Sequence, residues 1–272
     1  MNSLKNKKFF LLDMDGTIYL DDDLFDGTID FLSYVKSIGG RYMFLTNNSS
    51  RSVSAYVQKL KRIGIDAAEE DFLTSTDATI LYIKDKYQGR KFYAFGTTSF
   101  VEQLRSSGID VTTELSDDID ALVMGNDNEL TFKKLEDACI LLGRGVDYIA
   151  TNPDWVCPTS FGYVPDCGSV AEMLQRATGR TPHFIGKPRP EMLLLAMKKY
   201  GYSKEETVMM GDRLYTDIAS GHNAGVDTIF VLSGEGTLED VKKSDFQPTH
   251  IHKNIRETLN TISKEIQNDN SK

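Results

Sequence analysis

Four short apolar runs constrain the fold of this chain more than any other feature. They cover Phe9–Asp13, Tyr42–Thr46, Thr207–Asp212 and Thr228–Leu232. Unbroken apolar runs of this length are typical of strands that are buried on both faces of a parallel sheet. Helical periodicities alternate with them, and the clearest is an apolar stripe from Val53 to Ile63. This alternation predicts an α/β fold with a doubly wound, Rossmann-like parallel sheet.

The middle of the chain carries its own strand and helix signals. Lys91–Phe95, Ala121–Met124 and Tyr148–Ala150 read as strands, and Phe100–Leu104 and Phe132–Leu142 read as helices between them. A segment of about a hundred residues is large enough to form a domain. We therefore predict a discontinuous core of residues 1–78 and 183–272, into which a smaller α/β domain of residues 79–182 is inserted.

Polar residues end three of the predicted core strands, namely Asp13, Thr46 and Asp212. Ligands of doubly wound sheets bind outside the carboxyl ends of the strands, so these residues are expected to gather at one edge. Asp15 follows Asp13 by two positions, and carboxylates so close repel each other unless a cation lies between them. Mg²⁺ suits oxygen ligands beside a phosphate. The same residues also fit an ordinary Asp–Gly turn that closes a strand.

Composition excludes several classes of partner. Among 272 residues, 31 are basic and 40 are acidic, so the net charge of −9 disfavours nucleic acid and anionic membranes. The apolar run Phe9–Leu12 is far too short for a signal peptide or a membrane span, and we expect a cytoplasmic protein. The 3 cysteines lack C-x-x-C spacing, which indicates reduced thiols rather than a disulfide framework or a zinc site.

Four motifs in order resemble those of the haloacid dehalogenase (HAD) superfamily. They are Asp13-Met14-Asp15-Gly16-Thr17, Thr46-Asn47-Asn48-Ser49, Lys187 between Gly186 and Pro188, and Gly211-Asp212-Arg213-Leu214-Tyr215-Thr216-Asp217. The insertion falls between the second and third motifs, as in members with a large α/β cap. Thr151–Asp154 and Thr178–Pro182 are similar to the p-nitrophenylphosphatase-like branch. Asp166–Ser169 departs from the Gly-x-Gly-Ala of that branch, which affects details of the substrate-facing region.

This resemblance implies a Mg²⁺-dependent phosphatase that hydrolyses small phosphomonoesters. Asp13 would be the nucleophile that forms an aspartyl-phosphate, and Asp15 the general acid and base. The Mg²⁺ ligands would be Asp13, the backbone carbonyl of Asp15 and Asp212. Thr46, Asn47 and Lys187 would bind the substrate phosphate, and Asp217 would support the site by orienting Lys187 or a metal-bound water.

Several alternatives stay open at this point. Thr46–Ser49 also fits an ordinary helix N-cap. A catalytically silent binding protein or a phosphotransferase could use the same fold, although Asp15 favours transfer to water. The substrate could be a sugar phosphate, a nucleotide or another small phosphorylated metabolite. Caps of this kind often mediate dimers, so a homodimer through the cap is a further option.

Overall fold

The computed structural model describes residues 3–49, 52–159 and 161–270, which divide into two compact units. The core unit comprises Met1–Thr46, Val57–Leu73 and Lys187–Lys272, and the inserted unit comprises Asn47–Tyr56 and Thr74–Gly186. The inserted unit thus starts earlier and ends later than the segment 79–182 expected from sequence, and it also takes a short stretch after Thr46. The roles of the two units as catalytic core and cap remain predictions.

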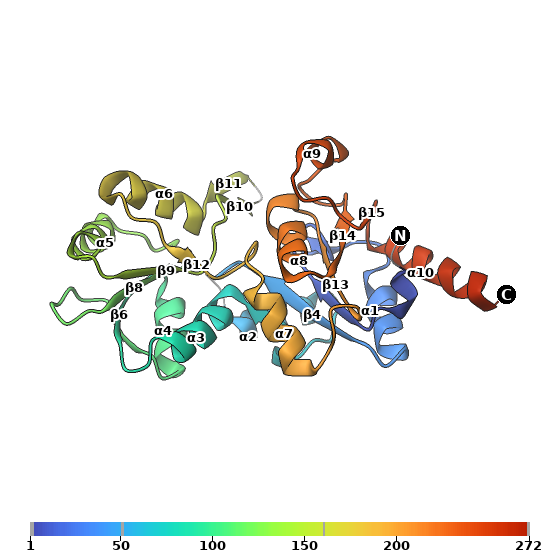
Figure 1. Cartoon of the computed structure of the whole chain (residues 1–272), viewed down its shortest axis with the longest axis horizontal. Helices are drawn as coiled ribbons and strands as arrows, with labels where there is room; N and C mark the ends of the chain where they lie inside the picture. Colours follow the sequence, from blue (N-terminus) through green and yellow to red (C-terminus); the bar gives the residue numbers. More distant parts are fainter. Residues whose placement is uncertain (1–2, 50–51, 160, 271–272) are drawn as a thin grey trace. The chain divides into compact units, whose positions relative to one another are not determined.

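A six-stranded sheet forms the centre of the core unit (Figure 1). Its order is β15 (His250–His252), β14 (Asp227–Val231), β13 (Thr207–Gly211), β1 (Phe9–Leu12), β4 (Arg41–Thr46) and β5 (Phe72–Thr74). The pairs from β15 to β4 are all parallel. β1 lies between β13 and β4, and all four of its side chains are buried. The four apolar runs are therefore confirmed as strands of a parallel sheet.

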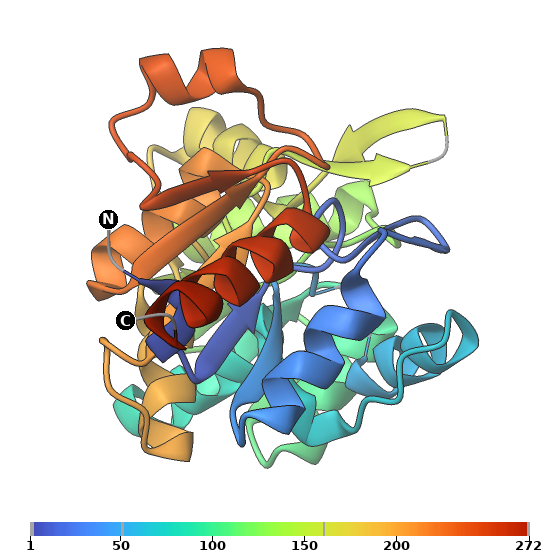
Figure 2. The same ribbon diagram turned by 90° about the vertical axis from the view of Figure 1, so that its right-hand side faces the viewer.

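Helices cover both faces of this sheet. The element β1–α1–β4, with α1 at Thr28–Ser37, and the element β13–α8–β14, with α8 at Ala219–Ala224, run in opposite directions along the sheet. Because such crossovers are right-handed, α1 and α8 lie on opposite faces. α1 packs against α10 (Ile255–Asn270), and α8 packs against α7 (Glu191–Tyr200). Figure 2 shows α1 and α10 side by side on their face of the sheet.

The remaining elements of the core unit are short. They are the 3₁₀ turns η1 (Leu4–Asn6) and η2 (Glu69–Asp71), the hairpin β2 (Tyr19–Leu20) and β3 (Asp23–Leu24), the π-helical turn η3 (Leu214–Ile218) and α9 (Leu238–Lys243). α2 (Val53–Arg62) passes from the inserted unit into the core unit. No helix in the described residues is both long and apolar enough to cross a membrane.

The inserted unit has its own five-stranded parallel sheet. Its order is β12 (His183–Phe184), β9 (Asp147–Ala150), β8 (Ala121–Met124), β6 (Lys91–Phe95) and β7 (Asp110–Thr112). Four helices accompany the sheet: α3 (Ser75–Lys86), α4 (Thr98–Ser106), α5 (Phe132–Arg144) and α6 (Cys167–Thr178). A separate antiparallel hairpin joins β10 (Val156–Thr159) to β11 (Gly162–Pro165). The predicted strands and helices of this region are confirmed, whereas the hairpin, α3 and α6 are additional.

Cys167, at the start of α6, is fully buried in the apolar core between α5, α6 and the sheet. Burial raises the pKa of its thiol to about 12, so the thiolate is scarce at neutral pH. At this position, this agrees with the expectation of an unreactive thiol.

Gly168, the next residue of α6, packs directly on the backbone of the Thr151–Asp154 segment. A Cβ at this position would lie 2.2 Å from the carbonyl oxygen of Pro153 and 2.8 Å from that of Asp154. The amide of Gly168 also donates a 2.8 Å hydrogen bond to the latter carbonyl. Backbone atoms cannot move aside as the end of a long side chain can, so the position requires glycine.

We expect Gly168→Ala to destabilise the protein by about 1–3 kcal/mol, because the added methyl group overpacks this contact. The matched control is Gly143→Ala in α5, where a Cβ would meet nothing within 4 Å. Since alanine favours helix, that variant should be as stable as the parent or up to about 1 kcal/mol more stable. Urea unfolding measures both, and equal stability of the two variants would contradict the prediction.

Candidate active site

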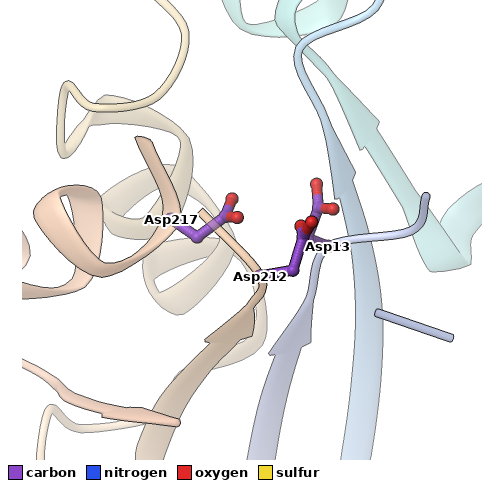
Figure 3. A group of neighbouring side chains, drawn as sticks. All are labelled: Asp13, Asp212 and Asp217. Carbon is purple, nitrogen blue, oxygen red and sulfur yellow. The ribbon is translucent and has the colours of Figure 1, made fainter. Parts of the chain in front are cut away.

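The carboxyl ends of β1 and β13 bring two acidic residues together. Asp13 directly follows β1, and Asp212 directly follows β13, which is the neighbouring strand. The amide of Asp13 donates a 2.9 Å hydrogen bond to the carbonyl of Met210, so Asp13 continues the strand pairing. Asp217 joins them, and carboxylate oxygens of the three residues all lie within 4.8 Å of one another (Figure 3). At this edge of the sheet, Asp13, Asp212 and Asp217 therefore form an acidic cluster.

Asp217 reaches the cluster from η3, a single π-helical turn of a kind that is frequent at functional sites. Its Oδ2 accepts a 3.0 Å hydrogen bond from the backbone amide of Arg213, which fixes the turn. Gly211 makes room for it, because a Cβ there would lie 2.3 Å from the Asp217 side chain. The motif Gly211–Asp217 thus supplies two carboxylates and also the glycine that lets Asp217 approach the end of β13.

Lys187 compensates part of this negative charge. Its ammonium donates hydrogen bonds to Asp13 Oδ1 at 2.5 Å, to Asp217 Oδ1 at 2.7 Å and to the carbonyl oxygen of Leu45 at 3.2 Å. Three acceptors match the three N–H bonds of an ammonium group. Burial lowers the pKa of Lys187, but the carboxylates of Asp13 and Asp217 outweigh burial and raise this pKa above its ordinary value. Lys187 is therefore cationic at neutral pH.

The protonation of two carboxyl groups is strongly perturbed. Burial, followed by the charge of Asp217, raises the pKa of Asp13 well above its ordinary value, and Lys187 works in the opposite direction. Burial, followed again by Asp217, raises the pKa of Asp212 to about 7. The Asp13 side chain keeps 16% of its surface exposed, whereas that of Asp217 keeps 1%. Asp13 is thus the member of this pair that an incoming substrate can contact.

Asp212 is held in a way that leaves one oxygen without a protein partner. Its Oδ2 accepts a 2.7 Å hydrogen bond from the amide of Glu235. Its Oδ1 is buried and has no hydrogen-bond partner in the part of the chain that the structure describes. Glycines enclose the carboxylate, since a Cβ on Gly16 or Gly234 would lie 2.5 or 2.0 Å from Oδ2.

A divalent cation with oxygen ligands fits this arrangement. Three carboxylates face a single ammonium, which leaves the cluster with two negative charges in excess when all groups are ionised. A buried carboxylate oxygen without a partner is costly unless a cation binds it. Hard oxygen donors of this kind suit Mg²⁺.

Asp15 does not bring its carboxylate into the acidic cluster. Its Oδ2 accepts a hydrogen bond from the Tyr19 hydroxyl at 3.3 Å, and its Oδ1 lies 3.6 Å from the Lys59 ammonium. Gly16, at φ +85°, turns the chain between Asp13 and the hairpin, and its amide donates to the carbonyl of Tyr19 at 2.8 Å. The carboxylates of Asp13 and Asp15 thus contact different partners, Lys187 for Asp13 and Tyr19 and Lys59 for Asp15. The proposed ligand role of the Asp15 backbone carbonyl stays a prediction.

Thr46 and Asn47 fall on either side of a unit boundary. Thr46 is the buried last residue of β4 and directly follows Leu45, whose carbonyl accepts from Lys187. Asn47 belongs to the inserted unit, where its side chain donates a 3.0 Å hydrogen bond to Asp154. The carbonyl of Asn47 accepts from the side chains of Ser75 and Asn152, each at 2.6 Å. Its side chain is thus committed to the inserted unit, and phosphate binding by its backbone stays a prediction.

Two residues near Asp15 were not foreseen from the sequence. Lys59 lies on α2 and Tyr19 starts β2, and neither belongs to one of the four motifs. The Lys59 ammonium lies 3.8 Å from the centre of the Tyr19 ring. Only the fold brings them to Asp15, because the apolar stripe of α2 predicts the buried face of that helix and no contact of its polar residues.

Comparisons with known proteins identify the family of this chain. A family model of haloacid dehalogenase-like hydrolases matches residues 10–110, and a HAD-hydrolase-like model matches residues 184–258. An acid sugar phosphatase of Staphylococcus haemolyticus is 35% identical over 264 residues, which are 97% of this chain and 100% of that protein.

Solved structures extend the comparison. The chain is 38% identical to a 4-nitrophenylphosphatase from Thermotoga maritima, with a TM-score of 0.90 over 95% of this chain and 98% of that one. It is 28% identical to a glycerol phosphate phosphatase from Mycobacterium tuberculosis, solved in complex with magnesium, with a TM-score of 0.88 over 94% of this chain and 78% of that one.

The fold and the acidic strand-end cluster define a hydrolase with a Rossmann-like core and an α/β insertion. The chain belongs to the haloacid dehalogenase-like hydrolases. Within this family it falls in the p-nitrophenylphosphatase-like branch, as the position of the insertion together with Thr151–Asp154 and Thr178–Pro182 predicts.

We expect Lys187→Met to destabilise the protein by about 3–5 kcal/mol at neutral pH in the presence of EDTA, because it leaves buried carboxylates without their counter-charge. The exposed Lys198→Met on α7 is the matched control and should stay within about 0.5 kcal/mol of the parent.

The pH dependence of this loss follows from the carboxyl pKa values. Lys187 lowers the pKa of Asp13, so its removal raises that pKa further. A carboxyl whose pKa is raised by folding stabilises the native state at low pH and loses that contribution as pH rises. The difference between Lys187→Met and the parent should therefore grow between about pH 5 and pH 8 in urea unfolding. A difference that is constant across this range would contradict the assigned charge compensation.

Proposed function

We propose that this protein is a Mg²⁺-dependent phosphatase that hydrolyses phosphomonoesters of small metabolites through an aspartyl-phosphate on Asp13. It is an enzyme that acts on phosphoric monoesters, in keeping with its family. The observation that carries the finer proposal is the acidic cluster itself. It combines a partly exposed carboxylate, Asp13, with the buried Lys187 ammonium at 2.5 Å and with an oxygen of Asp212 that has no hydrogen-bond partner among the described residues.

The first step is attack on phosphorus by Asp13. A bond forms between a carboxylate oxygen of Asp13 and phosphorus while the bond to the ester oxygen breaks. Negative charge spreads over the equatorial phosphoryl oxygens, and the Lys187 ammonium, fixed by Asp217 and Leu45, stabilises it. Bound Mg²⁺ would supply further positive charge against the phosphate, held by Asp13, Asp212 and the carbonyl of Asp15.

The position of Asp15 supports its proposed role as the acid for the leaving group. In an in-line displacement the attacking and leaving oxygens are on opposite sides of phosphorus, so the acid cannot contact the nucleophile. The Asp15 carboxylate, which is outside the acidic cluster and 43% exposed, meets this requirement. Asp15 gives its proton to the leaving oxygen in the first step. In the second step it takes a proton from a water molecule whose oxygen bonds to phosphorus as the Asp13–phosphorus bond breaks, which releases inorganic phosphate and frees the Asp13 carboxylate.

The relatives and the insertion support the proposed substrate class. The related proteins are named for sugar phosphates, nitrophenyl phosphate and glycerol phosphate, all of which are small phosphomonoesters. We propose that the inserted unit acts as a cap that selects among such metabolites. A panel of sugar phosphates, nucleoside monophosphates and glycerol phosphate, compared by kcat/KM, tests this. Preference for a phosphoprotein over every member of the panel would reject it.

Asp13→Asn should lower kcat for p-nitrophenyl phosphate by at least about a thousandfold, because an amide is a poor nucleophile. The variant removes one charge from a crowded acidic cluster, so it should unfold at the same temperature as the parent or a higher one. The parent itself should lose its activity in EDTA and regain it with MgCl₂. Near-normal turnover of Asp13→Asn, or activity that persists under chelation, would reject the mechanism.

Mg²⁺ binding should weaken as the pH falls below about 7. The pKa of Asp212 is about 7 and that of Asp13 is also raised, so a cation must displace protons that these carboxyls bind at lower pH. For each proton displaced, the affinity falls by up to about tenfold per pH unit below the pKa. Calorimetric titration in buffers of different ionisation enthalpy measures affinity and proton release together. Equal affinities at pH 6 and pH 8 would contradict the prediction, and Asp212→Asn should bind Mg²⁺ poorly at both.

A further inference from the structure

Asp15 is held by two groups that are outside the sequence motifs. Its two oxygens face different partners, the Tyr19 hydroxyl at 3.3 Å and the Lys59 ammonium at 3.6 Å. Lys59 in turn sits over the Tyr19 ring, with its nitrogen 3.8 Å from the ring centre. The three side chains therefore form a closed triangle in which each one contacts the other two.

The triangle has a rigid base. Tyr19 is fully buried, and its ring cannot move without disturbing the core. The Lys59 side chain is only 13% exposed, and it arises from the last turns of α2. A lysine confined between an aromatic face and a carboxylate loses the freedom that makes surface lysines poor at positioning. Asp15 itself is 43% exposed, so its orientation depends on these two contacts.

We propose that Lys59 is a positioning residue for Asp15, holding its carboxyl toward the leaving group and stabilising the charge that it acquires when it gives up its proton. This rests on the proposed general-acid role of Asp15. As the phosphorus–oxygen bond breaks, the proton moves from Asp15 to the leaving oxygen and the carboxyl becomes a carboxylate. The attraction to the Lys59 ammonium grows during that transfer, so it is stronger in the transition state than in the ground state and accelerates the step.

A leaving-group series tests this role. Nitrophenolate departs with little protonation, whereas a phenolate without the nitro group needs more help from an acid. For Lys59→Met, which removes the charge but keeps a stem over the Tyr19 ring, kcat/KM for phenyl phosphate should fall about tenfold or more. The loss for p-nitrophenyl phosphate should be less than about threefold. Lys59→Arg keeps the charge and should keep the leaving-group dependence of the parent.

Arg62→Met is the matched control. Arg62 lies on the same helix turn and pairs with Asp22 of the same hairpin at 2.8 Å, but both side chains are largely exposed. If Lys59 merely tethers the hairpin to α2, the two variants should behave alike. We expect kcat/KM of Arg62→Met to depend on the leaving group as it does in the parent. An equal loss for both phenyl esters in Lys59→Met, the same change in Arg62→Met, or no rescue by Lys59→Arg would overturn the proposal.

Asp15→Asn separates this inference from the function on which it rests. Suppose that kcat/KM depends more steeply on the leaving group in Asp15→Asn than in the parent, but that Lys59→Met keeps the dependence of the parent. That outcome would reject the role of Lys59 and leave the acid role of Asp15 intact. If Asp15→Asn kept the leaving-group dependence of the parent, the acid role itself would be rejected. Thermal unfolding of each variant verifies that the compared enzymes are folded.

Discussion

A buried ammonium held between two carboxylates is the interaction on which the rest of the site depends. Lys187 binds Asp13 and Asp217 at hydrogen-bond distance while Asp212 stands close by, so one positive charge faces three negative ones. Such a cluster is stable only if its geometry is fixed and its remaining charge is met from outside. In the proposed mechanism this excess of negative charge would attract a cation, and the bound cation would in turn allow a phosphate to approach.

Backbone geometry provides that fixed arrangement. Neighbouring parallel strands place Asp13 and Asp212 side by side, and a π-helical turn adds Asp217 across a glycine that leaves it room. Glycines at 16 and 234 enclose the Asp212 carboxylate. Asp15 is directed out of this cluster by the turn at Gly16. The motif therefore places one aspartate carboxylate inside the acidic cluster and the other outside it.

Local sequence patterns predict part of this structure. Phe9–Leu12 and Ala121–Met124 are unbroken apolar runs, which predict buried strands. Asp13 and Asp212 directly follow such runs, so their place at strand ends is predicted as well. The sequence does not predict α6, because Cys167–Thr178 mixes small and polar residues. It does not predict the hairpin β10–β11 either. The role of Lys59 is not predicted for a different reason. Its contact with Asp15 forms only when α2 packs against the core, and no spacing in the sequence indicates it.

The position of β1 has a consequence for how the chain is made. β1 is wholly apolar, and it lies between β4, which follows soon after it, and β13, which begins only at Thr207. During synthesis one edge of this strand stays unpaired while the whole inserted unit emerges, and unpaired apolar edges invite aggregation. The inserted unit has a sheet of its own and can fold in that interval. The core sheet can therefore be completed only after β13 has been made, and until then one edge of β1 is open to pairing with other chains.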